Sequence, residues 1–170
     1  HRGVGAATVR EIRSVTDQEL LAHHEAAHAV VAISLGWEIN QVTIVADDDT
    51  FGHCQVKDFE LYFDGNRWTG EVKASARQAI LYDLAGIAAE MRINGDYDEV
   101  GCSSDWGKAY TKARHLTRAC NPQTYLDYAL GRTKKLVNSH WQRVTAVAAG
   151  LLEHQTLTGE DVYTLAGMKP

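Results

Sequence analysis

Hydrophobic residues near the start of the chain recur with the 3.6-residue period of an α-helix. They predict a helix from about Asp17 onward, with one apolar side formed by Leu20, Leu21, Ala27, Val31 and Leu35. Thr16 and Glu19 form a capping-box pattern, which predicts that the helix starts near Asp17. Gly36 suits the position just after the last turn, where a left-handed backbone ends many helices.

Two short segments after this helix have the composition and alternation of β-strands. Ile39–Val45 and Phe51–Val56 contain β-branched residues and are separated by an acidic, turn-forming stretch, so they predict a hairpin. The edge of this hairpin can hold an extended peptide by main-chain pairing. Alternatively, the hairpin is purely structural.

The rest of the chain is predicted to be largely helical. The expected starting points of the later helices are, in chain order, Glu71, Ser103 or Ser104, Asn121 with Pro122, and Thr158. The helix that begins at Glu71 is expected to continue to about Asn94 and to end at Gly95. The predicted fold class is therefore mainly α, a helical bundle with a small β-hairpin or sheet next to the first helix.

Composition and charge narrow the class of protein. A chain of 170 residues with 45% hydrophobic residues can form one domain with its own core. The net charge of −5 and the scattered Lys and Arg argue against nucleic acid as a partner. No apolar run reaches the length of about 18 residues that a membrane segment needs. The three distant cysteines, Cys54, Cys102 and Cys120, favour free thiols in the cytoplasm or an equivalent reducing compartment.

The predicted first helix contains the sequence His24-Glu25-Ala26-Ala27-His28. Histidines four residues apart lie on one face of a helix, so both imidazoles can reach one metal ion about 2.0–2.1 Å away. Glu25 is then placed to accept a proton from water at that ion. This spacing is typical of zinc peptidases. The alternative, a pair of surface or capping histidines, is disfavoured by the apolar residues on both sides of the motif.

Two acidic residues are candidates for completing the metal site. Asp105 is expected in the first turn of a helix, where the helix dipole keeps a carboxylate ionised. Glu90 lies in a helix rich in small residues, which can pack closely against the metal helix and bring Glu90 near the ion as a ligand or supporting partner. The alternatives are an ordinary helix-stabilising carboxylate for Asp105 and a solvent-facing side chain for Glu90.

Taken together, these segments resemble the peptidase domain of FtsH-type membrane-anchored AAA proteases. The matching segments are His24-Glu25-Ala26-Ala27-His28-Ala29-Val30-Val31, Val42-Thr43-Ile44-Val45, Ala85-Gly86-Ile87-Ala88-Ala89-Glu90, Gly101-Cys102-Ser103-Ser104-Asp105, Leu151-Leu152-Glu153 and Leu157-Thr158-Gly159-Glu160-Asp161-Val162. The resemblance spans about residues 16–166. It implies a peptidase domain over residues 16–170, preceded by a leader over residues 1–15 that is ordered at most in part.

The resemblance implies that His24, His28 and Asp105 bind Zn²⁺, and it leaves Glu90 in a supporting role. It also implies that Glu25 is the general base of a zinc-dependent endopeptidase that hydrolyses peptide bonds in unfolded or flexible polypeptides. Two positions depart from the family, Ala27 where Gly is usual and Ile87 where Arg is usual. Neither departure removes a ligand or the base, although both change local packing.

The chain contains no nucleotide-binding P-loop and no membrane-spanning segment. It is therefore expected to be an excised domain, or a stand-alone relative that acts on loose chains, with a separate AAA ATPase or as a homo-oligomer. Two other functions stay open. One is an FtsH-peptidase-like scaffold or binding module that retains the zinc site with little or no proteolysis, and the other is a zinc hydrolase for a small substrate. The presence of Glu25 favours the peptidase, because a scaffold needs no general base.

Overall fold

The computed structural model describes residues 6–47, 51–57, 69–117 and 120–170, with residues 6–16 described by their backbone only. The elements are α1 (Ala6–Ser34), β1 (Ile39–Thr43), β2 (His53–Val56), α2 (Gly70–Asp83), α3 (Ala85–Asn94), α4 (Ser103–Leu116), α5 (Pro122–Ser139), α6 (Trp141–His154), β3 (Thr156–Thr158) and α7 (Gly159–Ala166). The fold is mainly α with one small antiparallel sheet, as predicted. None of the helices in these ranges is long and apolar enough to span a bilayer.

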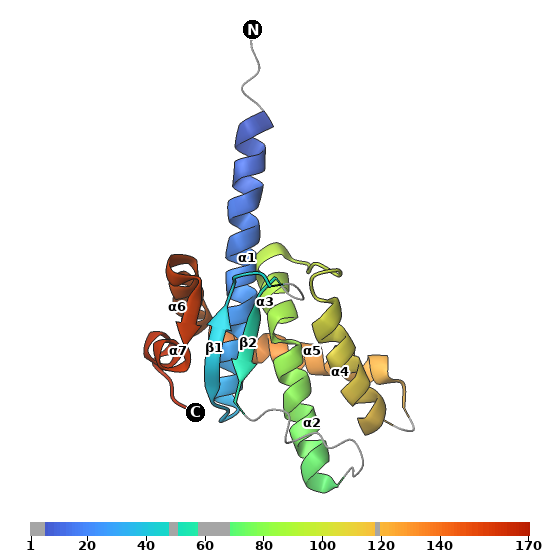
Figure 1. Cartoon of the computed structure of the whole chain (residues 1–170). Helices are drawn as coiled ribbons and strands as arrows, with labels where there is room; N and C mark the ends of the chain where they lie inside the picture. Colours follow the sequence, from blue (N-terminus) through green and yellow to red (C-terminus); the bar gives the residue numbers. More distant parts are fainter. Residues whose placement is uncertain (1–5, 48–50, 58–68, 118–119) are drawn as a thin grey trace.

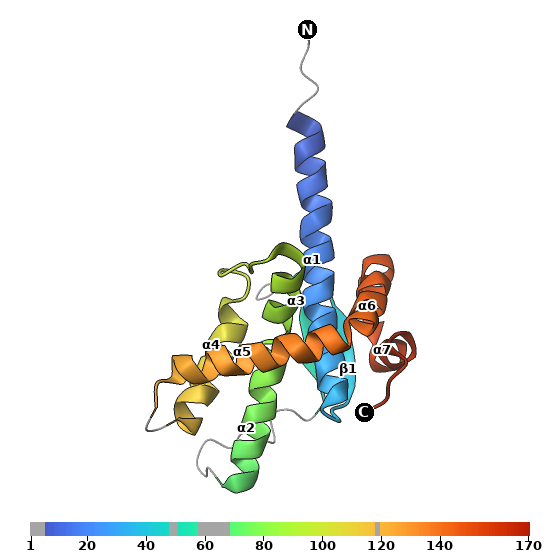
Figure 2. The ribbon, with the colours of Figure 1, turned by 180° about the vertical axis from the view of Figure 1, so that it is seen from behind.

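Helix α1 is the element around which the others are arranged. The sheet lies against one side of it, α3 and α5 lie on another, and α6 with α7 covers a third (Figures 1 and 2). Every residue from Ala22 to Ile33 is buried, so this part of α1 is enclosed on all sides rather than along a single stripe. Five alanines in this segment allow the neighbouring elements to approach closely.

The predicted start of the first helix is wrong. Helix α1 begins at Ala6, so Thr16 lies inside it and its capping-box pattern with Glu19 does not mark a helix start. The physical reason is that residues 6–15 contain no Gly or Pro, so nothing in that stretch stops a helix from extending toward the N-terminus. Most of the predicted leader is thus helical, and its residues 1–5 lie outside the described residues. The first turns of α1 extend beyond the rest of the fold (Figure 1).

The predicted hairpin is confirmed, and a third strand joins it. The strand order is β2-β1-β3, with both pairs antiparallel. Val42 of β1 pairs with Cys54 of β2 on one side and with Leu157 of β3 on the other. Strand β3 was not predicted because a three-residue strand directly before a helix has no alternating pattern of its own. Strand β2 is an edge strand among the strands described, and its outer side is open to main-chain pairing.

The single helix predicted over Glu71–Asn94 is two helices. Helix α2 ends at Asp83 and α3 begins at Ala85, with Leu84 between them. Leu84 itself is neither Gly nor Pro, and the apolar residues of the predicted helix continue on both sides of it, so their pattern did not indicate the break. The break has a structural consequence: the Tyr82 carbonyl, at the end of α2, accepts a hydrogen bond from a histidine of α1.

The later helix boundaries agree with the sequence except in two details. Helix α5 begins with Asn121 as its cap and Pro122 in its first turn, and α7 begins with a capping box formed by Thr158 and Asp161. In contrast, α4 has Cys102 as its N-cap residue instead of Ser103 or Ser104. The other exception is Gly131, a residue type that disfavours the interior of a helix, which lies within the uninterrupted helix α5.

A buried ion pair joins α2 to α4. The Lys112 ammonium lies 2.6 Å from the Asp83 carboxylate, which is only 1% exposed. Burial raises the pKa of Asp83 to about 6, even though Lys112 opposes the shift. The carboxylate is therefore ionised at neutral pH at a cost that the Lys112 ammonium partly offsets.

Removing one partner of this pair should cost more than removing both. We expect Lys112→Met to reduce the free energy of unfolding by about 3–5 kcal/mol, because it leaves the Asp83 carboxylate buried without its cation. Adding Asp83→Leu to that variant should recover most of the loss, since two apolar side chains then meet. Urea unfolding of the two variants and the wild type measures this. A double variant no more stable than Lys112→Met alone would contradict the interpretation.

Candidate metal centre

Three side-chain atoms from two distant helices meet in the fold. The Nε2 atoms of His24 and His28 are 3.1 Å apart, and Asp105 Oδ2 lies 3.0 Å from the first and 3.2 Å from the second. A tetrahedral zinc ion with ligands at about 2.0–2.1 Å separates its ligand atoms by about 3.3 Å. The observed separations are close to that value. Nitrogen and carboxylate oxygen are also the donor types that zinc prefers, so these residues fit the ion.

The Nδ1 atoms of His24 and His28 point away from Asp105, and their hydrogen-bond partners show that both carry a proton. His28 Nδ1 lies 2.8 Å from the Tyr82 carbonyl oxygen, which can only accept, so His28 Nδ1 donates. His24 Nδ1 lies 2.7 Å from a Glu90 carboxylate oxygen and donates to it in the same way. Rings held like this turn both Nε2 atoms toward the Asp105 carboxylate. Three electron-pair donors that face one another in this way can share a cation.

The charges around the rings favour a cation at the same place. Burial opposes ionisation of Asp105, but the nearby rings of His28 and His24 outweigh it and hold the pKa of this carboxyl well below its usual range. Burial likewise opposes a positive charge on His24, but its hydrogen bonds to Asp105 and Glu90 raise the pKa of the ring well above its ordinary value. The attraction that favours a proton on His24 Nε2 equally favours a metal ion there.

Glu25 lies next to the three converging atoms but is not one of them. It is 5% exposed, and burial raises the pKa of its carboxyl, although the charges of His28 and His24 oppose this. Among the described residues, no hydrogen bond or ion pair engages the Glu25 carboxylate. A buried carboxylate that the neighbouring protein leaves free, beside a candidate metal site, is suited to accepting a proton from water.

Glu90 and Cys102 form a layer behind His24. Glu90 accepts from His24 Nδ1 with one oxygen and from the Asp98 amide at 2.9 Å with the other, so both carboxylate oxygens are engaged. Although burial opposes it, these bonds lower the pKa of Glu90 and keep it ionised. The buried Cys102 thiol lies 3.9 Å from His24 Nδ1, and burial raises its pKa. Glu90, Cys102 and His24 are close enough to form a second cluster of metal-ligand types, but the His24 nitrogen on that side donates to Glu90.

Two glycines allow the site to be this compact. A Cβ atom on Gly86 of α3 would lie 2.3 Å from His24 Nε2, so the ring occupies the space above a residue without a side chain. A Cβ on Gly52, just before β2, would lie 2.9 Å from the Thr43 carbonyl and 3.2 Å from Glu25 Oε1. Close approach of backbone to the site therefore requires glycine at both positions.

The structure brings all the sequence-predicted site residues together. Asp105, 81 residues from His24 in the chain, contacts both motif histidines, whereas Glu90 contacts only the outer nitrogen of His24. Sequence reasoning missed Tyr82 and Cys102 as neighbours of the rings. The Tyr82 contact uses a backbone carbonyl and so has no residue-type signal. Cys102 did have a sequence signal, because it lies three residues before Asp105 in the segment over residues 101–105 that carries the family resemblance.

Comparison with known proteins gives a distant similarity to zinc metalloproteases of the FtsH type. The chain is 25% identical to the ATP-dependent zinc metalloprotease FTSH 11, chloroplastic/mitochondrial, of Arabidopsis thaliana, with 88% of this chain and 21% of that protein aligned. It is also 25% identical to the ATP-dependent zinc metalloprotease FtsH of Lactococcus lactis, with 95% of this chain and 28% of that protein aligned. The chain thus spans roughly a fifth to just over a quarter of the length of these relatives. No family model matches the chain.

Gly86→Ala should disturb the metal centre directly. The added methyl group overlaps the His24 ring, so we expect zinc affinity to fall about tenfold to hundredfold and stability to fall by about 1–3 kcal/mol. Gly131→Ala is the matched control, because a Cβ at that helical position meets no atom within 4 Å. Zinc titration and thermal unfolding measure both effects. If Gly86→Ala binds zinc as tightly as Gly131→Ala, the ring is not where the geometry places it.

Glu90→Gln tests the support of His24 separately. Glutamine has one carbonyl oxygen in place of two carboxylate oxygens, so it cannot accept from both His24 Nδ1 and the Asp98 amide. We expect zinc affinity to fall about tenfold to hundredfold, and Asp105→Asn, which alters a converging donor itself, to have a larger effect. Competition with a chromophoric chelator gives the affinities. Unchanged affinity in Glu90→Gln would show that the carboxylate does not support the ring.

Proposed function

We propose that this chain is a zinc-dependent endopeptidase that hydrolyses peptide bonds in unfolded or flexible polypeptides. The observation that supports this most is the convergence of His24 Nε2, His28 Nε2 and Asp105 Oδ2 within 3.2 Å of one another. The unengaged Glu25 carboxylate beside them supplies the second requirement of the reaction, a base. Distant similarity to zinc metalloproteases supports the same class of chemistry.

In this proposal, each side chain has a defined task. His24, His28 and Asp105 would hold the zinc ion, and Tyr82 and Glu90 keep the two rings oriented through their outer N–H groups. When bound, zinc supplies Lewis-acid polarisation of the peptide carbonyl and lowers the pKa of water. Glu25 takes a proton from the attacking water and delivers it to the leaving amine. Burial raises the pKa of Glu25, which makes its carboxylate a better proton acceptor than an exposed glutamate.

Strand β2 offers a way to hold the substrate. It is the edge strand of the sheet among the strands described, and Gly52 immediately before it approaches Glu25 closely. An extended chain paired with the open side of β2 would therefore run past the proposed base. This favours a polypeptide over a small substrate, because a small molecule has no extended main chain that could form hydrogen bonds with β2.

The fuller assignment includes the partners and the compartment. We propose that the chain cleaves loose polypeptides by itself and that folded substrates require a separate AAA ATPase partner or a homo-oligomeric assembly. The three cysteines are free within the described residues, and a reducing compartment such as the cytoplasm remains our expectation. The alternative function is the scaffold, in which the same residues retain zinc but do not cleave.

Substitution of Glu25 separates the peptidase from the scaffold. We expect the purified wild type to hold about one zinc ion per chain and to cleave casein, whereas Glu25→Gln retains zinc and loses activity by a factor of about 10² to 10⁴. Metal analysis and release of labelled casein fragments provide the two readouts. Glu153→Gln, at an exposed position far along the chain, is the matched control and should cleave normally.

The remaining outcomes discriminate between the alternatives. If wild type and Glu25→Gln both bind zinc and neither cleaves casein, the scaffold interpretation replaces the peptidase. If neither binds zinc at neutral pH, the metal site itself is wrong. Cleavage of small esters or amides without cleavage of casein would favour a hydrolase for small substrates.

A further inference from the structure

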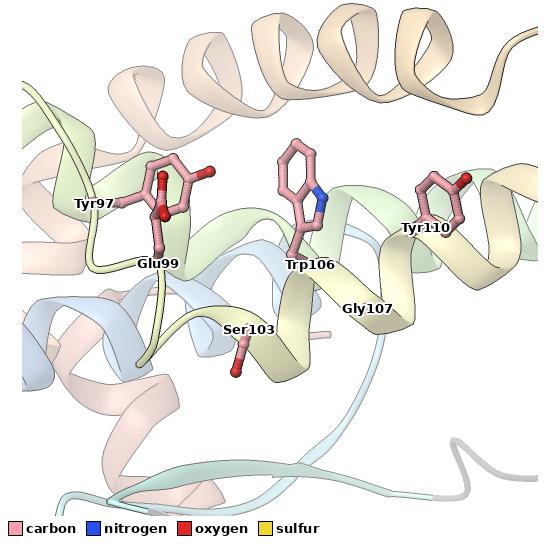
Figure 3. A pocket seen from close by; sticks show the side chains of 6 residues that line it. All are labelled: Tyr97, Glu99, Ser103, Trp106, Gly107 and Tyr110. Atoms are coloured by element: carbon pink, nitrogen blue, oxygen red, sulfur yellow. The ribbon is translucent and has the colours of Figure 1, made fainter.

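An aromatic pocket lies on the flank of the helix that carries Asp105. It is open to solvent, has a volume of about 370 Å³ and is lined by Tyr97, Glu99, Ser103, Trp106, Gly107 and Tyr110. Figure 3 shows the three aromatic rings in a row along one side of α4, with the Glu99 carboxylate beside the Tyr97 ring. The rings of Tyr97 and Trp106 are stacked, with their centroids 6.4 Å apart. No residue of this pocket takes part in the metal centre.

The pocket is close to the metal centre along the chain. Asp105 and Trp106 are consecutive residues of α4, so their Cα atoms are about 3.8 Å apart and their side chains leave the helix about 100° from each other. The pocket and the metal centre therefore occupy adjacent flanks of the same helical turn. A chain crossing the beginning of α4 can reach both.

The loop that borders the pocket is acidic, whereas the nearest cation on α4, Lys108, lies 3.7 Å from Asp105 Oδ1. The loop over residues 95–101 contains Asp96, Asp98 and Glu99 and no basic residue. Two of these carboxylates accept backbone N–H groups nearby, Asp96 from Tyr97 and Asp98 from Val100. Burial and the charges of Glu99 and Asp96 raise the pKa of Tyr97, which is consistent with a negative potential at its ring.

Glu99 is the acidic side chain among the residues that line the pocket. In the parts of the chain that the structure describes, no basic side chain forms an ion pair with it. The same fold pairs a guanidinium with an aromatic ring elsewhere, where Arg92 Cζ lies 4.5 Å from the centroid of Trp141. Aromatic faces attract cations, and a carboxylate beside them adds a direct partner.

We propose that this aromatic pocket, which we call the α4 pocket, binds an arginine side chain of the polypeptide substrate. The pocket offers a guanidinium aromatic faces to lie against and the Glu99 carboxylate to pair with (Figure 3). An uncharged apolar side chain would leave Glu99 without that partner, and an acidic one would be repelled by it. Arginine is favoured over lysine because its planar group both stacks and forms paired hydrogen bonds.

One consequence of the inference rests on the proposed peptidase function, namely the position of the cleaved bond relative to the bound arginine. An extended chain advances about 3.3 Å per residue and a helix is about 10–12 Å across. A substrate that places arginine in the α4 pocket would therefore be cut about three to four residues away from it. Binding of the arginine itself does not require cleavage.

The binding test uses Glu25→Gln protein, which is expected not to cut the probe. Two fluorescein-labelled unstructured peptides are compared that differ only in one central residue, arginine or its uncharged analogue citrulline. We expect the arginine peptide to bind about three to ten times more tightly by fluorescence anisotropy. Its advantage should shrink as salt is added, because the pairing with Glu99 is exposed to solvent.

Variants of exposed pocket residues locate the effect. Glu99→Gln and Tyr110→Leu, each added to Glu25→Gln, should reduce the preference for arginine to less than twofold. The matched controls are Glu153→Gln and Tyr128→Leu, which change exposed residues outside the pocket and should leave the preference intact. Trp106 and Tyr97 are not substituted because they also pack against the core.

Three outcomes would overturn the inference. They are equal binding of the arginine and citrulline peptides, equal binding when arginine is replaced by norleucine, and an arginine preference that survives Glu99→Gln and Tyr110→Leu. Failure of the peptidase proposal is recognised separately, because it appears as absence of casein cleavage by the wild type while the arginine preference persists. Cleavage of casein without any arginine preference would reject the α4 pocket alone.

Discussion

Electron-pair donors that face one another inside a protein repel unless a positive charge lies between them. The candidate metal centre brings three such donors within 3.2 Å of one another, two from α1 and one from α4. Much of the fold serves to hold this arrangement. The segment of α1 that carries His24 and His28 is enclosed by the sheet and by helices on its other sides, so the rings cannot turn outward to water.

In both His24 and His28, the hydrogen bond that Nδ1 donates fixes the direction in which Nε2 points. His28 donates to a backbone carbonyl that the break between α2 and α3 places at the end of a helix, and His24 donates to the Glu90 carboxylate on α3. The Nε2 atom of each ring thereby faces Asp105. Two successive helices on one side of α1 thus fix the orientation of both rings, and Gly86, which lies between those contacts, leaves room for the His24 ring.

The parts of the fold and of the site that could be predicted are those that depend on residues close together in the sequence. The histidine spacing, the hairpin and the caps of α5 and α7 depend on residues close together in the chain, and the sequence was sufficient for them. The helix break at Leu84, the third strand and the carbonyl partner of His28 depend on tertiary contacts that leave no local pattern. The early start of α1 was missed for a different reason: a capping pattern is compatible with a helix interior when the preceding residues also favour a helix.

Helix α4 contributes to three separate parts of the molecule. Its first turn presents Asp105 to the histidines, the same turns line the α4 pocket on an adjacent flank, and Lys112 further along pairs with buried Asp83 of α2. The position of the carboxylate at the metal centre thus depends on contacts along the whole helix. A contact that moves α4 would move Asp105 with it, because the helix behaves as one rigid element. Asp105 of the candidate metal centre and the lining of the α4 pocket are therefore carried by the same helical turns, and the ion pair of Lys112 with Asp83 ties that helix to α2.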